Sequence, residues 1–372
     1  MRILLIAHNV IRGDGQGRVN FEIARHGLAQ GHDVTILSSR VDSELIAKGA
    51  KWVSIPSRLR RAGVLHHWQF TRMADRHVAQ LRASADIVVG NGYTVTAPHD
   101  VNLSQFVHHA WRRHRIGPRE RGPRAWYQSF YSRCNEHLER MSYDAARVVI
   151  ACSSSVRNEL LSAGFPSTKI RVIFSGVDSV EFQPGIEDRA ALGLPCDVPL
   201  ALFVGDIRTY RKNLDTVLNA LVTTPSIHLA VVGAVDRSPF PAMASALGIA
   251  DRVHFLGYRR DVSRIMRACT FLAFPTRYEP FGLVILEAMS SGLPVVTTRV
   301  AGAAELMSED TGVLLDNSEN VESLAEAMEK MSTSSNRSRA GDAARKLAES
   351  HSWAHMAAQY LEVFEELHHG RS

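Results

Sequence analysis

The sequence has few of the features that mark secreted, membrane-spanning or metal-binding proteins. Its four cysteines are scattered over 372 residues without a CxxC pair, so we expect neither a disulfide framework nor a cysteine metal site. No run of about 20 apolar residues is present, and we therefore expect no membrane-spanning helix. The apolar run at the N-terminus stops at His8, too early for a signal peptide. These absences predict a cytoplasmic location.

Composition and charge limit the class of fold and the kinds of partner that this chain can have. Hydrophobic residues make up 45% of the chain and charged residues 22%, which excludes a disordered or fibrous chain. A length of 372 residues favours two domains over one. Residues 1–200 carry 26 Lys and Arg against 18 Asp and Glu, whereas the remainder carries 17 against 20. The basic first half favours an anionic partner, such as a membrane, a phospholipid-linked acceptor or a nucleic acid.

Short apolar runs alternate with helical stretches and predict parallel sheets. Residues 3–7 precede a glycine-rich segment, a helical pattern over residues 19–30 and a second apolar run at 33–37, which is one β-α-β unit. Further strands are expected at 86–90, 147–151, 170–174, 200–204, 228–232, 253–256, 271–274, 294–297 and 312–315.

Two series of these units predict an α/β fold of two doubly wound, Rossmann-like domains. The charged and proline-containing stretch 187–199 predicts the linker. We place an acceptor-binding domain at 1–188 and a donor-binding domain at 195–352, with a final helix at about 353–372 crossing back to the first. Ligands are expected beyond the carboxyl ends of the strands, in the cleft between the domains.

The most informative motif lies at residues 277–296, where Glu279 and Glu287 are eight residues apart after a strand. We expect a helix from about Pro280, on which this spacing is about 12 Å of rise and suits contacts to a hexose and a ribose. The amides of Gly282 and Leu283 would then lie at the helix N-terminus, where a diphosphate is attracted. The same spacing also occurs by chance on solvated helices.

This block resembles the E-x7-E region of glycosyltransferase family 4, a retaining family with the GT-B fold of two Rossmann-like domains facing across a cleft. Other segments match the family pattern in order: 204–208 with 212–214, 231–233, 253–257, 301–305, 311–315 and 352–353. The resemblance is dense in the second half and sparse in the first. Ser175 stands where the family commonly has asparagine.

The resemblance implies roles for these residues. Arg208 and Lys212 would hold the donor diphosphate, Glu279 would contact the sugar, and Glu287 the ribose. The predicted donor-binding set is Gly15, Gly17, Arg208, Lys212, Glu279, Phe281, Gly282, Leu283 and Glu287, and the predicted catalytic set is Glu279, His108, Arg208 and Lys212. We expect neither a metal nor a cofactor, because the two cations supply charge and the chain has no Asp-x-Asp motif.

Two features of the first half remain ambiguous. The loop with Gly15 and Gly17 fails the dinucleotide fingerprint because Arg18 follows it; in the family it faces the donor phosphate, and the alternative is a tight structural turn. The family also has a histidine that reaches the sugar. Here His108 and His109 are adjacent, and we choose His108.

Arginines interleaved with aromatic residues form two segments of the first half, residues 111–133 and 58–70. Such segments suit an anionic lipid surface. They also suit single-stranded nucleic acid, and a solvated basic loop is the plainest alternative.

The sequence thus predicts a retaining glycosyltransferase that moves a hexose-type sugar from a nucleotide-diphosphate sugar to a cell-envelope glycan or lipid-linked acceptor. We expect a peripheral position on the inner face of the cytoplasmic membrane, and no nucleic acid partner. The alternatives are a nucleotide-sugar epimerase or hydrolase on the same fold and, in another class, a basic nucleic-acid-binding or membrane-binding protein.

Overall fold

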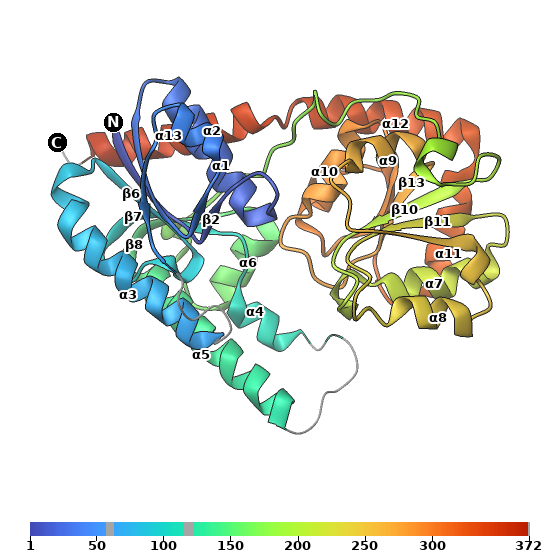
Figure 1. Ribbon diagram of the computed structural model, residues 1–372, viewed down its shortest axis with the longest axis horizontal. Coiled ribbons are helices and arrows are strands. Elements are labelled where there is room, and N and C mark those ends of the chain that lie inside the picture. The colour runs from blue at the N-terminus through green and yellow to red at the C-terminus, as the bar shows by residue number, and fades with distance from the viewer. Residues whose placement is uncertain (57–62, 115, 117–122, 371–372) are drawn as a thin grey trace. The chain divides into compact units, whose positions relative to one another are not determined.

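A computed structural model describes residues 1–56, 63–114, 116 and 123–370. The chain divides into two compact units, Met1–Gly176 with Trp353–Ser372 and Val177–Ser352. Each unit is a parallel β-sheet flanked by helices (Figure 1). Among the described residues, no helix has both the length and the apolarity needed to cross a bilayer.

The first unit contains a seven-stranded sheet in the order β5-β3-β1-β6-β7-β8-β9. Its central strands are buried along nearly their whole length, as expected where helices cover both faces of a parallel sheet. The strands are β1 Arg2–Ile6, β3 Asp33–Ser38, β5 Lys51–Ser54, β6 Ile87–Asn91, β7 His99–Ser104, β8 Ala146–Ala151 and β9 Ile170–Val172, with a separate pair of β2 Asn9–Val10 and β4 Arg40–Val41.

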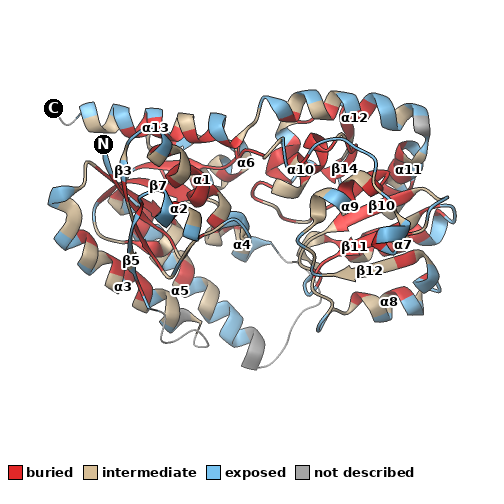
Figure 2. Ribbon diagram, turned by 45° about the horizontal axis from the view of Figure 1, so that its top comes forward, coloured by how far each residue is buried: buried red, intermediate tan, exposed pale blue. Residues whose placement is uncertain are grey.

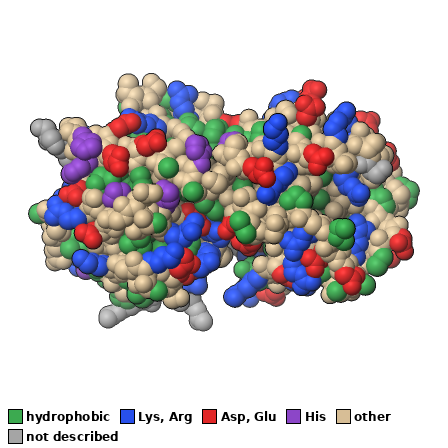
Figure 3. Space-filling view, turned by 90° about the horizontal axis from the view of Figure 1, so that it is seen from above, with side chains coloured by type: hydrophobic (Ala, Val, Ile, Leu, Met, Phe, Trp, Pro, Cys, Tyr) green, Lys and Arg blue, Asp and Glu red, His purple; other side chains and the backbone are tan. Residues whose placement is uncertain are grey.

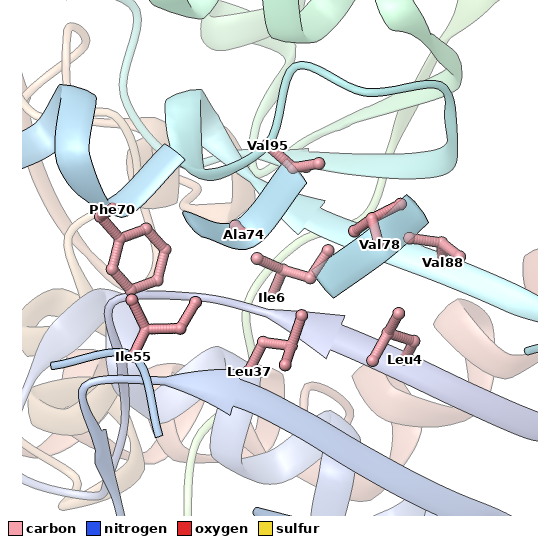
Figure 4. Packing of buried hydrophobic residues seen from close by; sticks show 9 residues of the cluster. All are labelled: Leu4, Ile6, Leu37, Ile55, Phe70, Ala74, Val78, Val88 and Val95. Atoms are coloured by element: carbon pink, nitrogen blue, oxygen red, sulfur yellow. The ribbon is translucent and has the colours of Figure 1, made fainter. Parts of the chain in front are cut away.

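Helices of the first unit pack against this sheet through apolar stripes. Figure 4 shows Phe70, Ala74 and Val78 of one helix facing Leu4 and Ile6 of β1. This cluster is the core beneath one face of the sheet. The helices are α1 Gly15–Ala29, α2 Ser43–Ala47, α3 Val64–Leu81, α4 His108–Arg113, α5 Pro123–Ala145, α6 Ser154–Ser162 and α13 Trp353–His369.

The second unit contains a six-stranded sheet in the order β12-β11-β10-β13-β14-β15. Figure 2 shows buried strands and inner helix faces, with exposure confined to outer faces and loops. Its strands are β10 Leu200–Val204, β11 His228–Val232, β12 Val253–Gly257, β13 Phe271–Phe274, β14 Val295–Thr298 and β15 Gly312–Leu315. Its helices are α7 Leu214–Thr223, α8 Phe240–Ala246, α9 Val262–Ala268, α10 Leu283–Ser290, α11 Val321–Ser332 and α12 Ser334–Glu349.

The chain passes between the units at Gly176 and Val177, so the predicted boundary at 188–195 is too late. The predicted linker is bonded to the second unit instead. Glu187 accepts hydrogen bonds from Arg264 (2.8 Å) and Arg267 (3.0 Å), and Arg189 donates to the carbonyl of Ala268 (2.7 Å). Charged residues of the stretch 187–199 therefore bind it to the second unit, so the stretch is a surface segment of that unit.

The final helix α13 packs along α1 of the first unit. Trp353, its first residue, is buried, and the guanidinium of Arg18 lies over its ring at 5.4 Å from the centroid. Farther along the helix, Glu366 pairs with Arg171 at 2.6 Å. These contacts anchor the last helical segment to the first sheet.

Candidate active site

In the second unit, a loop at the carboxyl end of β10 carries the predicted phosphate-binding residues. The loop turns closely over β11: a Cβ added at Gly233 would lie 2.3 Å from the carbonyl oxygen of Gly205, so only glycine permits this approach. A 3₁₀ turn, η5 Tyr210–Lys212, then leads into α7. Lys212 is thereby placed at the edge of the sheet where ligands of such folds bind.

Lys212 forms an ion pair with Glu279, and both side chains are nearly buried. The ammonium also lies 5.1 Å from the centroid of the Phe274 ring. Burial and the neighbouring Arg211 lower the pKa of Lys212 well below its usual value, whereas the Glu279 carboxylate favours the ammonium form. The structure therefore brings together two of the predicted catalytic residues, Lys212 and Glu279.

Arg211 and Arg208 differ in their surroundings. Arg211 is half-buried, lies 4.0 Å from the Glu279 carboxylate and donates to the carbonyl of Tyr278 (3.4 Å). Arg208 is exposed and pairs with Asp206 at 2.8 Å. Arg211 is thus the cation beside the Lys212–Glu279 pair. It is not among the residues predicted from the sequence, although it directly precedes Lys212.

Arg277 fixes the loop between β10 and α7 through several hydrogen bonds. Its guanidinium donates to Asp215 (2.8 Å) at the start of α7, to Glu319 (2.6 Å) and to the carbonyl of Tyr210 (2.7 Å). Its amide donates to the carbonyl of Arg211 (3.0 Å). Arg277 therefore fixes the turn that carries Arg211 and Lys212, a role that the sequence gives no sign of.

The two glutamates of the motif do not share a helix. Helix α10 begins only at Leu283, after Gly282 in a left-handed conformation (φ 96°), so Glu279 lies in the preceding loop and the expected helical rise between the glutamates is wrong. The loop is bound to the segment after β14: the carbonyls of Glu279 and Phe281 accept hydrogen bonds from the amides of Gly302 (3.0 Å) and Ala303 (2.7 Å). Glu287 is on α10 and is half-buried.

In the first unit, a pocket of about 270 Å³ lies at the carboxyl ends of β1, β6 and β7. Its lining is polar, with His8, Asn9, Asp14, Gln16, Asn20, Asn91, Tyr93, Thr94, Gln105, His108 and Glu139 beside Ala7, Gly17, Gly92 and Phe106. Figure 3 shows that the histidines visible on one face of the molecule gather over this unit.

The two adjacent histidines have different positions. His108 lines the pocket, and its Nδ1 and backbone amide contact the Glu139 carboxylate at 3.0 and 2.8 Å. His109 is not among the lining residues, and its Nδ1 lies 2.8 Å from Glu136. Of the two, His108 is the one whose ring is presented to the pocket. Glu139 is a functional candidate that sequence reasoning missed, because it lies mid-helix without a motif.

The predicted glycine loop is mostly helical. Helix α1 begins at Gly15, earlier than the expected residue 19, with Asp14 as its N-cap. Gly15 is exposed, whereas Gly17 is buried and lines the pocket. A Cβ at Gly17 would lie 3.2 Å from the carbonyl oxygen of Ile11, so close packing accounts for this glycine whether or not it approaches a phosphate.

The basic and aromatic segments are described only in part. Residues 57–62, 115 and 117–122, which include Arg58, Arg60, Arg61, Arg115, Arg119 and Arg121, lie outside the described residues. On α5, Trp126 is 72% exposed and stacks on Phe130 at 5.9 Å between ring centroids. On α3, Trp68 is half-exposed and lies under the guanidinium of Arg72 (4.6 Å).

Two family models match the chain. Glycosyltransferase Family 4 matches residues 13–181, and Glycosyl transferases group 1 matches residues 186–347. The chain belongs to these glycosyltransferases. This membership confirms the resemblance that the sequence motifs carry.

Individual relatives agree with this assignment. The lipopolysaccharide core biosynthesis glycosyltransferase LpsE of Rhizobium meliloti is 30% identical over 203 residues, which are 54% of this chain and 58% of LpsE. The structure of WaaG, a glycosyltransferase involved in lipopolysaccharide biosynthesis, is 22% identical with a TM-score of 0.80 and covers 97% of this chain and 99% of its own. Anabaena HepE in complex with UDP-glucose is 18% identical with a TM-score of 0.75 and covers 98% and 100%.

At these identities the structural matches show the fold alone, and they confirm the predicted GT-B class for this glycosyltransferase. The chain spans between 39% and 62% of the length of the curated relatives that it matches. The roles of individual residues stay predictions that rest on the geometry above.

Proposed function

We propose that this chain transfers a hexose-type sugar from a nucleotide-diphosphate sugar to a hydroxyl group of a saccharide or lipid-linked acceptor. The observation that carries the proposal is the nearly buried Lys212–Glu279 pair, with Arg211 beside it, at the carboxyl edge of the second sheet. Cations in such a place bind a diphosphate strongly, because burial strengthens charge-assisted contacts.

The proposed reaction replaces one bond at the anomeric carbon by another. The bond to the diphosphate oxygen breaks, the acceptor oxygen bonds to the same carbon, and the acceptor proton passes to the departing phosphate. Lys212 and Arg208, together with Arg211 beside the pair, stabilise the negative charge that develops on the diphosphate, so the proposed reaction requires neither a metal nor a cofactor. In this proposal the acceptor oxygen attacks the anomeric carbon on the same face that the diphosphate leaves, so the anomeric configuration is retained.

Glu279 and Glu287 complete the proposed donor site. When a diphosphate binds, it replaces Glu279 as the counter-ion of Lys212, and the carboxylate becomes available to accept hydrogen bonds from sugar hydroxyls. Glu287 binds the ribose, and the amides of Gly282 and Leu283 face the phosphates at the start of α10. HepE, whose structure contains UDP-glucose, supports a uridine nucleotide as the first donor to test.

The proposed acceptor is a cell-envelope glycan or a lipid-linked saccharide. The similarity to LpsE and WaaG, both named for lipopolysaccharide biosynthesis, supports it. The exposed Trp126, Phe130 and Trp68 support peripheral binding to the inner face of the cytoplasmic membrane, since aromatic and basic groups together favour an anionic interface. Binding to anionic liposomes that fails at high salt is expected; equal binding to neutral liposomes would contradict this part.

The test is turnover of UDP-, GDP- and ADP-sugars by the pure chain, with and without cell-envelope lipid extract. Release of nucleoside diphosphate that requires the extract, with a product whose anomeric configuration by NMR matches the donor, supports the proposal. An inverted product contradicts retention alone. Release that is equal without any acceptor favours a nucleotide-sugar hydrolase, and a changed sugar with no release favours an epimerase.

A further inference from the structure

The pocket of the first unit contains buried polar atoms that the protein leaves unpaired. Among the described residues, neither nitrogen of His8 has a hydrogen-bond partner, and the same holds for Oδ1 of Asn20 and Nδ2 of Asn91. All three side chains line the pocket and belong to the first unit. Buried polar groups are ordinarily satisfied, so these atoms indicate a ligand that supplies several hydrogen bonds within a small volume.

The charge of the pocket limits what that ligand is. Asp14 and Glu139 are acidic members of the lining, and no Lys or Arg is among the lining residues that the structure describes. Arg18, the basic residue beside Gly17 on α1, is paired with Glu22 at 2.7 Å. A phosphate group in this pocket would meet two carboxylates and no cation, which disfavours it.

The buried ring of His8 also limits the chemistry of the ligand. Its ring is packed against Phe70 at 4.1 Å between centroids and lies 5.5 Å from the rings of both His66 and His67. Burial and these two histidines lower the pKa of His8 to about 3, so the ring is neutral at physiological pH. A neutral imidazole donates one hydrogen bond and accepts another, which matches hydroxyl groups better than anionic oxygens.

We propose that this pocket binds an uncharged, hydroxyl-rich sugar ring of the acceptor and discriminates against a phosphorylated one, with His8 as a specificity-determining residue. A sugar hydroxyl both donates and accepts hydrogen bonds, which suits the neutral donors and acceptors of His8, Asn20 and Asn91 in the pocket lining. The volume of about 270 Å³ lies just below the range of roughly 300–1,000 Å³ of pockets for drug-sized ligands, as expected for a single ring. This inference rests on the proposed function, since it names the acceptor class of that reaction.

The experiment is ligand-observed NMR with the full chain, using methyl glycosides of glucose, galactose and mannose and the 6-phosphates of the same hexoses. At least one methyl glycoside is expected to bind about 10-fold more tightly than its hexose phosphate. His8→Phe keeps an aromatic ring against Phe70 and removes both nitrogens, and it is expected to weaken that methyl glycoside about 10-fold without lowering Tm.

A second variant adds the missing cation. Gln105 lines the pocket, and Gln105→Lys is expected to raise the affinity for the hexose phosphates. Phosphates that bind the unchanged protein as well as the methyl glycosides do, no binding by any methyl glycoside, unaltered binding in His8→Phe, or an unaltered preference in Gln105→Lys would each overturn the inference.

A donor-site variant separates this inference from the proposed function. Lys212→Met lies in the second unit, and it is expected to abolish nucleotide binding while leaving methyl glycoside binding unchanged. A chain that binds methyl glycosides but no nucleoside diphosphate would contradict the proposed function and leave the sugar pocket standing. The reverse result would contradict the sugar pocket alone.

Discussion

The two units present opposite chemistry at the same position of similar sheets. At the carboxyl edge of the second sheet, Lys212, Arg211 and Glu279 form a nearly buried cluster of charges. At the carboxyl edge of the first, His8 and Asn91 line a pocket with unpaired neutral polar atoms. A parallel sheet fixes where a ligand binds, and the loops after its strands decide which ligand it is. The contrast suits a diphosphate in one unit and a hydroxyl-rich ring in the other.

The largest expected effect comes from the charged cluster. Lys212→Met is expected to lower kcat/KM roughly 1,000-fold. It is also expected to destabilise the fold by about 3 kcal/mol, because the nearly buried Glu279 carboxylate keeps only Arg211, 4.0 Å away, as a counter-ion. The double variant Lys212→Met/Glu279→Gln should recover most of the stability and none of the activity. Kinetics and chemical denaturation measure the two effects, with Lys330→Met, at an exposed lysine of α11, as the matched control.

Recovery of activity in the double variant would show that the pair serves stability alone. The contrast between the units would then lose its functional meaning at the second sheet, and Arg208 or Arg211 would have to supply the charge for the diphosphate.

The core of the first unit provides a test of independence. Phe70 is fully buried between α3 and the sheet, so Phe70→Ala is expected to cost about 3–5 kcal/mol of unfolding free energy. Nucleotide binding, which we assign to the second unit, should keep its Kd at temperatures where this variant is folded. Calorimetric titration checks this, and a Kd that weakens as strongly as in Lys212→Met would contradict the assignment to the second unit alone.

The two adjacent histidines offer a smaller and sharper contrast. His108→Asn is expected to lower kcat/KM by about 10- to 100-fold, as for the loss of one well-placed hydrogen bond, with little change in Tm. His109→Asn is the matched control, because His109 pairs with Glu136 outside the pocket lining. Steady-state kinetics decide between them, and equal losses in both variants would show that the pocket position of His108 is irrelevant.

The smallest expected effect is on pH dependence. The pKa of Lys212 is lowered by burial and Arg211 from its usual 10.5, and a bound diphosphate favours the ammonium form. Nucleotide affinity should therefore be full at lower pH and fall as pH rises through the lowered pKa, before the usual lysine range is reached. Titrations across alkaline pH measure this, and the same pH dependence in Lys212→Met would assign it to another group.

Hydrophobic strands were the part of the fold that the sequence predicted best. Residues 200–204, 228–232, 271–274 and 312–315 coincide with β10, β11, β13 and β15, because a strand covered on both faces is a continuous apolar run. Strand β7 was missed because it contains buried polar residues. Asp100, for example, accepts hydrogen bonds from the Val88 amide (2.9 Å) and from Arg82 (3.3 Å), a pairing that no local pattern reveals.

In the candidate site, too, residues within sequence motifs were predicted, and residues that act through partners distant in sequence were missed. Lys212 and Glu279 were selected from motifs and lie in contact. Arg277 and Glu139 were missed, because each acts through partners distant in sequence, Asp215 and Glu319 for one and His108 for the other. Long-range contacts of this kind come from the packing of the sheet and helices, which short motifs do not encode.

A nucleoside diphosphate is expected to bind at the charged edge of the second sheet. Thermal unfolding of the protein with UDP, GDP, ADP or NAD measures this binding. One nucleoside diphosphate at about 100 times its Kd should stabilise the protein by roughly 2.7 kcal/mol, and the effect should vanish in Lys212→Met/Glu279→Gln. If no nucleoside diphosphate raises Tm, or the double variant responds as fully as the unchanged chain, the assignment of the donor site is contradicted.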